Sequence, residues 1–365
     1  MGKVRVLVVD DSVVIRRMLT EILSGDPSVE VVGTASNGRI AVQKITQIQP
    51  DVVVMDVEMP EMNGLEALAE MRKTHARLPI IMFSTLTTRG GTATLDALAL
   101  GATDYVAKPA NMGSVQASID RIREELLPKV KVLGGAPNVV AATAPAAAPS
   151  APAPVRRPRP PGPTRVDIVA IGVSTGGPKA LGEIIPRLPG DLPVPIVIVQ
   201  HMPPIFTGLL AERLDATSAL EVREAHEADR VTAGRVLIAP GDFHLRVVQR
   251  GDGVHAQLDQ GPPENSCRPA VDVLFRSVAE VYGSSALAVV LTGMGQDGLR
   301  GAEVLVEAGG RVVAQDERTS VVWGMPGFVA RAGLAEDLVP LDVVASEIVR
   351  RVQSSSRLPS AGGVR

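Results

Sequence analysis

The chain has 365 residues, more than one small hydrophobic core usually supports, so we expect two domains. A net charge of −3 and an aromatic content of 2% argue against nucleic acid as a ligand. The single cysteine, Cys267, excludes an intrachain disulfide framework and fits a reducing compartment. No apolar stretch approaches the roughly 20 residues that span a bilayer, so we expect a cytoplasmic protein without direct membrane insertion.

The first part of the chain alternates short apolar runs with amphipathic stretches. The apolar runs are VRVLVVD, VEVVGTA, DVVVMD, PIIMFS and DYVAKP, and helical spacing appears between them, for example at 13–24 and 64–73. Nearly continuous apolar strands that alternate with helices predict a parallel sheet covered on both faces. We therefore expect an α/β domain over residues 1–128.

Polar side chains stand at the carboxyl ends of these strands, where open α/β sheets bind their ligands. Asp10 and Asp11 follow the first run, and Asp56 ends the third. Ser84 and Lys108 end the fourth and fifth runs. Three carboxylates at one edge repel one another without a cation, and clustered oxygen ligands suit Mg²⁺. A lysine and a hydroxyl beside them could bind the oxygens of a phosphoryl group carried by a carboxylate.

These motifs resemble the response-regulator receiver family. VVDDS, VVMDVEMPEMNGLEAL, MFSTLT and YVAKP cover its motif set over about residues 4–127. The resemblance implies a flavodoxin-like sheet with Asp56 as the phosphorylated aspartate. It implies that Asp10, Asp11 and Asp56 form a Mg²⁺ site, and that Ser84 and Lys108 sense the phosphate.

A segment rich in alanine and proline follows. It has no apolar periodicity, and proline lacks an amide donor and disfavours helix at the preceding residue. We therefore interpret residues 129–164 as an extended linker whose arginines are solvated. We interpret residues 354–365 as a disordered tail.

The alternating pattern returns after the linker. The runs VDIVAIG, VPIVIVQH, LEVREA, RVLIAP, ALAVVLTG and GRVVAQD predict a second, doubly wound α/β domain over residues 165–353. FHLRVVQ and GVHAQLD flank RGD, which predicts an inserted β-hairpin.

The first of these runs ends in GVSTG, a G-x-S-x-G pattern between an expected strand and an expected helix. A sharp turn there would lift the Ser174 hydroxyl above the sheet edge, and the amides that follow, beginning at Thr175, could face a developing oxyanion. The pattern alone leaves three interpretations open: a nucleophile, a phosphate cradle at a helix N-terminus, or a plain turn.

A nucleophilic serine needs a base, and the base needs an orienting acid. His201 ends a buried-type strand next in sequence to the serine strand, so it emerges at the same edge, whereas His244 is ambiguous at a strand start. Asp297 follows another buried-type strand with a glycine-rich exit, and Asp316 is its rival by the same rule. The order serine, histidine, aspartate differs from that of α/β-hydrolases.

This half resembles the chemotaxis protein-glutamate methylesterases, the CheB family. IGVSTGGP, VQHMPPIFTGLLAERL, APGDFHL, CRPAVDVLFRSVA, LTGMGQDGLRGA and QDERTSVVWGMPGFVA match its blocks in order over about residues 167–332. The resemblance implies Ser174 as nucleophile, His201 as general base and acid, and Asp297 as orienting carboxylate. It also implies the Met294 backbone as part of the oxyanion environment, and we expect no cofactor in this domain.

The implied reaction is hydrolysis of glutamate γ-methyl esters on the cytoplasmic helices of chemoreceptors. Deamidation of receptor glutamines is implied as a second activity, because an amide passes through a similar tetrahedral intermediate. The implied phosphodonor is a chemotaxis histidine kinase, and we expect a monomer in which the unphosphorylated receiver covers the catalytic edge. The alternatives are a phospho-regulated binding module with an inactive esterase domain, and a nucleotide-binding regulator. The latter lacks the G-K-[ST] of a P-loop, since Pro178 precedes Lys179.

Overall fold

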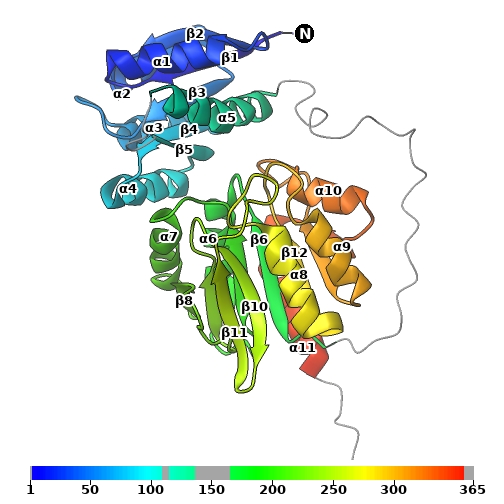
Figure 1. The fold of residues 1–365 in the computed structure, drawn as a ribbon. Helices are drawn as coiled ribbons and strands as arrows, with labels where there is room; N and C mark the ends of the chain where they lie inside the picture. The colour runs from blue at the N-terminus through cyan, green and yellow to red at the C-terminus, as the bar shows by residue number, and fades with distance from the viewer. Residues whose placement is uncertain (1, 109–114, 136–164, 357–365) are drawn as a thin grey trace, which may run out of the picture. The chain divides into compact units, whose positions relative to one another are not determined.

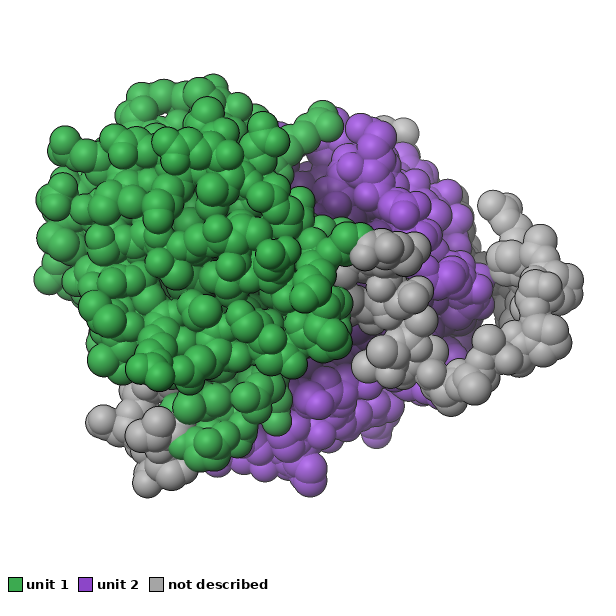
Figure 2. Space-filling view, turned by 90° about the horizontal axis from the view of Figure 1, so that it is seen from above, with its two compact units in different colours: residues 1–146 green, residues 147–365 purple. Residues whose placement is uncertain are grey.

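The structure is a computed structural model that describes residues 2–108, 115–135 and 165–356. Residues 136–164 of the expected linker and 357–365 of the expected tail lie outside the described residues. The chain divides into two compact units, residues 1–146 and 147–365 (Figure 2). No helix in the described ranges combines the length and the apolar character that a membrane span requires.

In the first unit, strands and helices alternate along the chain (Figure 1). The strands are β1 (Val4–Val9), β2 (Val29–Ala35), β3 (Val52–Asp56), β4 (Ile80–Thr85) and β5 (Asp104–Lys108). The helices are α1 (Val13–Ser24), α2 (Gly38–Ile48), α3 (Gly64–Thr74), α4 (Thr88–Ala99) and α5 (Val115–Leu133). The strands pair in parallel in the order β2-β1-β3-β4-β5. The expected parallel sheet is confirmed, and α5 continues to Leu133, into the range expected as linker.

Polar residues just after the strands begin the first four helices of this unit. In each case the side chain accepts a hydrogen bond from a backbone amide of the helix's first turn, as expected of a helix N-cap. The capping residues are Ser12, Asn37, Asn63 and Thr87. The helices that follow β1 to β4 are therefore each capped by a polar side chain from the connecting segment.

The strand order of the first unit has a switch point between β1 and β3. From β1 the chain moves to β2 on one side, and from β3 it moves to β4 on the other. Right-handed crossovers then place the connecting helices on opposite faces, which opens a crevice at the carboxyl ends of these two strands. Asp10 follows β1 and Asp56 is the last residue of β3, so both acids stand at this crevice.

The second unit is built on a longer parallel sheet with the order β14-β13-β12-β6-β7-β9-β8. Its strands are β6 (Ile168–Val173), β7 (Ile196–Gln200), β8 (Glu221–Glu224), β9 (Arg235–Ile238), β12 (Ala286–Val290), β13 (Arg311–Gln315) and β14 (Asp337–Val339). Strands β10 (His244–Arg250) and β11 (Gly253–Asp259) pair as the expected antiparallel hairpin. The sequence patterns do not anticipate β14, which is too short to show an apolar period.

Helices and two short 3₁₀ turns connect these strands. They are α6 (Gly177–Ile184), η1 (Ile185–Arg187), α7 (Phe206–Asp215), α8 (Val271–Tyr282), η2 (Gly283–Ser285), α9 (Leu299–Glu307), α10 (Met325–Arg331) and α11 (Leu341–Ser356). The chain leaves β6 toward β7 and leaves β12 toward β13, in opposite directions along the sheet. The expected doubly wound sheet is therefore confirmed, with its switch point between β6 and β12.

Helix α8 packs against β6, β12 and the β10 strand of the hairpin (Figure 1). The approach to β6 is close, since a Cβ atom at Gly172 would lie 2.3 Å from Cγ1 of Val271. Gly172 is near the end of β6 and Val271 is the first residue of α8. The glycine therefore lets the N-terminus of α8 rest directly over the carboxyl end of β6, beside the switch point.

A buried arginine ties the C-terminal helix of the second unit to β14. The Arg351 side chain on α11 is 1% exposed and forms ion pairs with Glu336 at 2.5 Å, Glu347 at 2.6 Å and Asp337. Glu347 also pairs with Arg350, and hydrogen bonds from Arg350 and Arg351 lower the pKa of Glu347 to about 2. The Glu347 carboxylate is therefore ionised across the neutral range.

We expect Arg351→Leu to lower the unfolding free energy of this unit by about 3 kcal/mol, because it leaves a cluster of carboxylates without its buried cation. Arg350→Leu is the matched control, since the Arg350 side chain is 60% exposed and such a pair contributes about 0–1 kcal/mol. The fluorescence of Trp323, the single tryptophan, monitors denaturation of this unit.

The pKa of Glu347 is depressed, so its contribution to stability is full above its unfolded-state pKa and is lost as the pH falls toward 2. The difference between wild type and Arg351→Leu should shrink over that acid range. Equal losses in the Arg350→Leu and Arg351→Leu variants would contradict the role given to burial.

Candidate functional site

Ser174 stands in a tight turn between β6 and α6, as the G-x-S-x-G pattern predicts. Its backbone N–H donates to Thr292 O at 3.0 Å, and its carbonyl accepts from the N–H of Gly177 at 2.8 Å. Gly176 has φ +79°, in the left-handed region that only glycine enters without strain. The turn is thus tied to the end of the neighbouring strand β12 on one side and to the start of α6 on the other.

The turn after β12 packs directly against the serine. A Cβ atom at Gly293 would lie 2.8 Å from the Cβ of Ser174, so only glycine allows this approach. Met294 is the next residue of that turn, and Thr175 is the next residue of the serine turn. The two residues expected to form the oxyanion environment therefore belong to the two turns that meet at Ser174.

His201 leaves the neighbouring strand β7 at the same edge. Its backbone N–H donates to Val173 O at 3.2 Å, which extends the pairing of β6 with β7 by one residue. Its side chain is 13% exposed, and Nε2 lies 2.7 Å from Oδ2 of Asp297. The histidine and the aspartate chosen from the sequence are therefore in direct contact.

The Asp297 carboxylate lies at the N-terminus of α8. Its Oδ2 accepts from Val271 N–H at 2.7 Å, and its Oδ1 accepts from Asp272 N–H at 3.0 Å. These amides have no partner within the helix, and the positive end of the helix dipole favours an anion there. Burial alone would raise the pKa of Asp297, but bonds to His201 and to these amides lower it below its usual value. The acid beside His201 is therefore a carboxylate.

Asp316, the rival acid, belongs to a different loop. Its Oδ1 accepts from the N–H of Thr319 at 3.0 Å and from the hydroxyl of the same residue at 2.5 Å, while Oδ2 lies 3.8 Å from Arg318. Asp316 thus caps the loop after β13. Among the described residues, its carboxylate forms no hydrogen bond with His201, and Asp297 is the strand-end acid that does.

His244, the other histidine considered at a strand start, is held by backbone groups. Its side chain is buried, with Nε2 at 3.1 Å from Pro262 O and Nδ1 accepting from Ala270 N–H at 3.2 Å. Both ring nitrogens therefore have structural partners, which fits a role in fixing the segment that precedes α8.

Nδ1 is the nitrogen of His201 that remains for proton transfer, because Nε2 faces Asp297. It lies 3.6 Å from Sγ of Cys267. Among the described residues, the Ser174 hydroxyl forms no hydrogen bond with His201. Catalytic hydrogen bonds are often long or absent in a ligand-free enzyme and tighten when substrate is bound.

Cys267 also affects the protonation of His201. Burial lowers the pKa of this imidazole, but the charge of Cys267, and hydrogen bonds to Asp297 and Cys267, outweigh burial and raise the pKa to about 10. A raised pKa favours the protonated ring, so the neutral form that accepts the serine proton becomes more populated as the pH rises.

Sequence reasoning assigned no role to the loop that precedes α8. Asn265 in this loop donates from Nδ2 to Asp272 Oδ2 at 2.9 Å and to Asp297 Oδ1 at 3.0 Å. Asn265 and Ser266 both have positive φ, at 51° and 63°, so the loop is tightly turned. The available sequence signal is the run Asn265-Ser266-Cys267 before the apolar helix α8. No local pattern indicates that the side chains of this run reach Asp297 and His201, which follow other strands.

In the first unit, the expected acids come together as predicted. Ligand oxygens of Asp10, Asp11 and Asp56 lie within 4.8 Å of one another. Nζ of Lys108 lies 3.0 Å from Asp10 and 2.8 Å from Asp56. Burial raises the pKa of Asp56 to about 6, opposed by Lys108 and assisted by the charge of Asp10. This excess of clustered, partly buried oxygen ligands fits a small divalent cation.

Ser84 is also at this edge. Strand pairing aligns Asp56 with Phe83 and Ser84 with Ala107, the residue before Lys108. The Ser84 hydroxyl is buried and donates to Gly90 O at 3.1 Å. The serine and the lysine expected to sense the phosphate are thus on adjacent strands beside Asp56.

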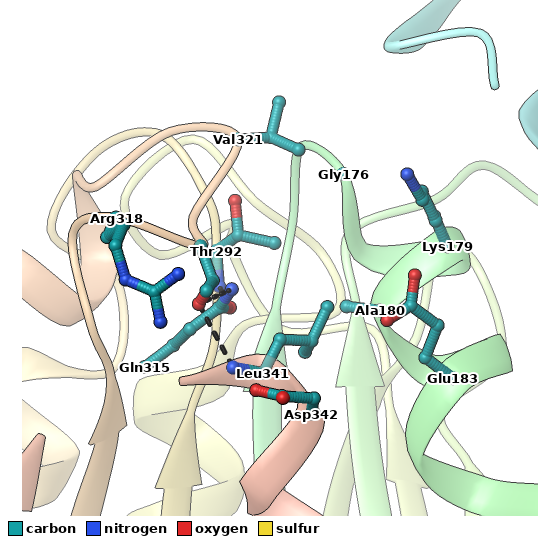
Figure 3. Close-up of a pocket in the computed structure, with 11 residues that line it drawn as sticks. Gly176, Lys179, Ala180, Glu183, Thr292, Gln315, Arg318, Val321, Leu341 and Asp342 are labelled. Atoms are coloured by element: carbon teal, nitrogen blue, oxygen red, sulfur yellow. Dashed lines mark hydrogen bonds between the residues drawn. The ribbon is translucent and has the colours of Figure 1, made fainter. Parts of the chain in front are cut away.

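A cavity of about 300 Å³ opens beside the serine turn (Figure 3). Gly176 and Thr292 form part of its wall, and Lys179 and Arg318 lie on either side of it. Its lining includes neither Ser174 nor His201. The cavity therefore adjoins the turn and is separate from the histidine and aspartate.

Two family models match the chain. A model described as CheB methylesterase matches residues 169–348, and one described as response regulator receiver domain matches residues 6–120. These ranges coincide with the two sheets and contain both clusters of site residues.

Curated relatives resemble the chain over nearly its whole length. A protein-glutamate methylesterase/protein-glutamine glutaminase of Trichodesmium erythraeum is 52% identical over 96% of this chain and 100% of the relative. One of the same name from Nocardioides sp. is 52% identical over 99% of each. The crystal structure of the Thermotoga maritima CheB methylesterase catalytic domain is 48% identical, with a TM-score of 0.50, and covers 51% of this chain and 98% of that domain.

We expect Cys267→Ser to lower the pKa of His201, because the charge of Cys267 raises it in the wild type. NMR titration of the His201 ring measures the change. Ser266→Ala is a control in the same loop and should leave the titration where it is. A His201 titration that is identical in the Cys267→Ser variant would contradict this account of its pKa.

Proposed function

We propose that this chain is a phosphorylation-regulated protein-glutamate methylesterase and protein-glutamine glutaminase. It belongs to the CheB methylesterase family and carries a response regulator receiver domain. Its substrates are glutamate γ-methyl esters and glutamines on the cytoplasmic helices of chemoreceptors. The observation that carries the proposal is the His201–Asp297 contact beside the Ser174 turn. An inactive binding module would have no need to keep that pair intact.

In the first half of the reaction, Ser174 attacks the ester carbonyl. Asp297 accepts the hydrogen bond of Nε2–H and so keeps the proton of neutral His201 on that nitrogen, which leaves Nδ1, 3.6 Å from Cys267 Sγ in the ligand-free state, as the proton acceptor. Nδ1 takes the hydroxyl proton as the serine oxygen bonds to the carbonyl carbon. The negative charge that develops on the carbonyl oxygen is stabilised by backbone amides of the two turns, at Thr175 and Met294.

The tetrahedral intermediate then collapses. The bond from carbon to the methoxy oxygen breaks, and the leaving group takes the proton from Nδ1 and departs as methanol. Water next attacks the acyl-serine, again giving a proton to His201, and the glutamate side chain is released as Ser174 regains its proton. With a glutamine substrate the leaving group is ammonia, and the same groups act in the same order.

Residues of the first unit control this activity. Asp56 is the phosphoryl acceptor, and Asp10, Asp11 and Asp56 would hold Mg²⁺, which would offset the negative charge gathered at this edge. Lys108 and Ser84 bind the phosphoryl oxygens and change position when the charge on Asp56 changes. The phosphodonor is a chemotaxis histidine kinase, and the protein acts as a cytoplasmic monomer.

Ser174→Ala should abolish methanol release from methylated chemoreceptor, with a loss of at least about 10³-fold, because the members of a triad act as a unit. Gas chromatography of released methanol measures the activity, and circular dichroism verifies the fold. Ser346→Ala, an exposed serine on α11, is the matched control and should retain full activity. Hydrolysis at the wild-type rate by a folded Ser174→Ala protein would exclude Ser174 as the nucleophile.

A small-molecule phosphodonor with Mg²⁺ should raise the rate of methanol release by the wild type and leave the rate of Asp56→Ala unchanged. The reason is that the Asp56 carboxylate ends β3 at the edge where Asp10, Asp11 and Lys108 gather, with Nζ of Lys108 2.8 Å from its Oδ2. Glu70→Gln alters an exposed acid on α3 and should respond like the wild type. A normal response by Asp56→Ala would show that another residue accepts the phosphoryl group.

A further inference from the structure

Gln200 is a buried polar residue at the end of an otherwise apolar strand. It closes β7, whose sequence is IVIVQ, and it is 1% exposed. Burying a glutamine orders a flexible side chain and removes an amide from water, and both effects cost free energy. An apolar residue would fill the position at lower cost, so the amide group needs an explanation.

The amide of Gln200 joins the two segments that carry the nucleophile and the base. Its Nε2 donates to Ser174 O at 3.1 Å and to His201 O at 3.1 Å. Backbone pairing between β6 and β7 ends just before this point, where His201 N–H donates to Val173 O. The β6–β7 pairing ends at that bond, and the side chain of Gln200 adds one more link between the two segments.

The position and orientation of this amide are tightly restricted. A Cβ atom at Gly177 would lie 1.8 Å from Oε1 of Gln200, so the side chain fits only because residue 177 is glycine. None of the described residues donates a hydrogen bond to Oε1. Turning the amide over would place Oε1 against two carbonyl oxygens, so the observed orientation is the one that the surroundings allow.

We propose that Gln200 is a positioning residue of the esterase: it sets the separation between the Ser174 turn and the backbone of His201. The inference rests on the proposed function. In the ligand-free state the Ser174 hydroxyl is not bonded to His201, so their meeting in the reaction depends on where the two backbones hold them. A displacement of about 1 Å at such a site can reduce the rate about 10²-fold.

Gln200→Met tests the proposal, because it keeps the length of the side chain and removes both donors. The expected result is a loss of about 100-fold in kcat on methylated receptor with KM within about twofold, since Gln200 is buried beneath the turn rather than exposed to the ester. An unchanged kcat would overturn the proposal.

Gln315→Met is the matched control for the loss of a buried amide. Gln315 ends β13 and is fully buried; its Oε1 accepts from Thr292 N–H at 2.9 Å and its Nε2 donates to Thr319 at 3.2 Å (Figure 3). It bonds to neither Ser174 nor His201. Both variants should lose similar thermal stability, with kcat reduced much less by Gln315→Met. Equal losses of kcat would show that general loosening, not positioning, is responsible.

Gln200→Glu supplies a readout that a purely structural role would not produce. A protonated carboxyl group has one O–H to donate to these carbonyls and a carboxylate has none, and burial raises the pKa of such an acid. Activity relative to wild type at the same pH should therefore be highest at low pH and fall as the pH rises. A ratio that does not change with pH would contradict the requirement for a donor.

Labelling of Ser174 by a fluorophosphonate separates this inference from the proposed function. The probe reacts with an activated serine and does not depend on the receptor substrate. If the wild type labels rapidly but releases no methanol from receptor, the proposed substrate is wrong while the positioning role can still be measured. Gln200→Met should label about 100-fold more slowly than wild type, and equal labelling rates would overturn the inference.

Discussion

The second unit depends on one buried carboxylate, that of Asp297, to join segments that are distant in sequence. Its two oxygens accept hydrogen bonds from the first amides of α8, from the side chain of Asn265, from the amide of Gly298 and from His201. A buried anion is costly unless each lone pair is used, and here the N-terminus of α8 provides two of these five donors. The same bonds that stabilise the charge therefore hold the loop before α8, the exit of β12 and the base in one arrangement.

Both units place their chemistry at a topological switch point, and they stabilise their buried charges in different ways. In the first unit, Asp10 and Asp56 share Lys108, and their mutual repulsion helps to keep the pKa of Asp56 above its usual value. Such a site can bind a cation and can accommodate a change in the charge carried by Asp56. In the second unit, His201, the Asn265 side chain and backbone amides stabilise the charge of Asp297, which suits an acid that only has to orient its histidine.

The exit of β7 shows how the sheet supplies geometry to the site. Gln200 and His201 are consecutive, so their side chains point to opposite faces of the strand. One is buried between the strand ends and bonds to backbone carbonyls, and the other reaches Asp297. Opposite the free nitrogen of His201 lies Cys267, from the loop before α8. The base is thus held from the strand on one side and from the helix on the other.

The sequence by itself determined the two parallel sheets, the hairpin and the carboxylates of the first unit, and it favoured Ser174, His201 and Asp297 at the second site. These features depend on local rules: apolar runs become buried strands, glycines mark tight turns, and polar residues at strand ends meet at one edge. The sequence could favour Asp297 over Asp316 but could not decide between them, because both follow a buried strand. Only the tertiary structure decided that one reaches His201 while the other caps its own loop. It also decided the contacts of Cys267, Asn265 and Gln200, since a side chain's partner across strands and loops depends on how the backbones pack, and no local pattern encodes that.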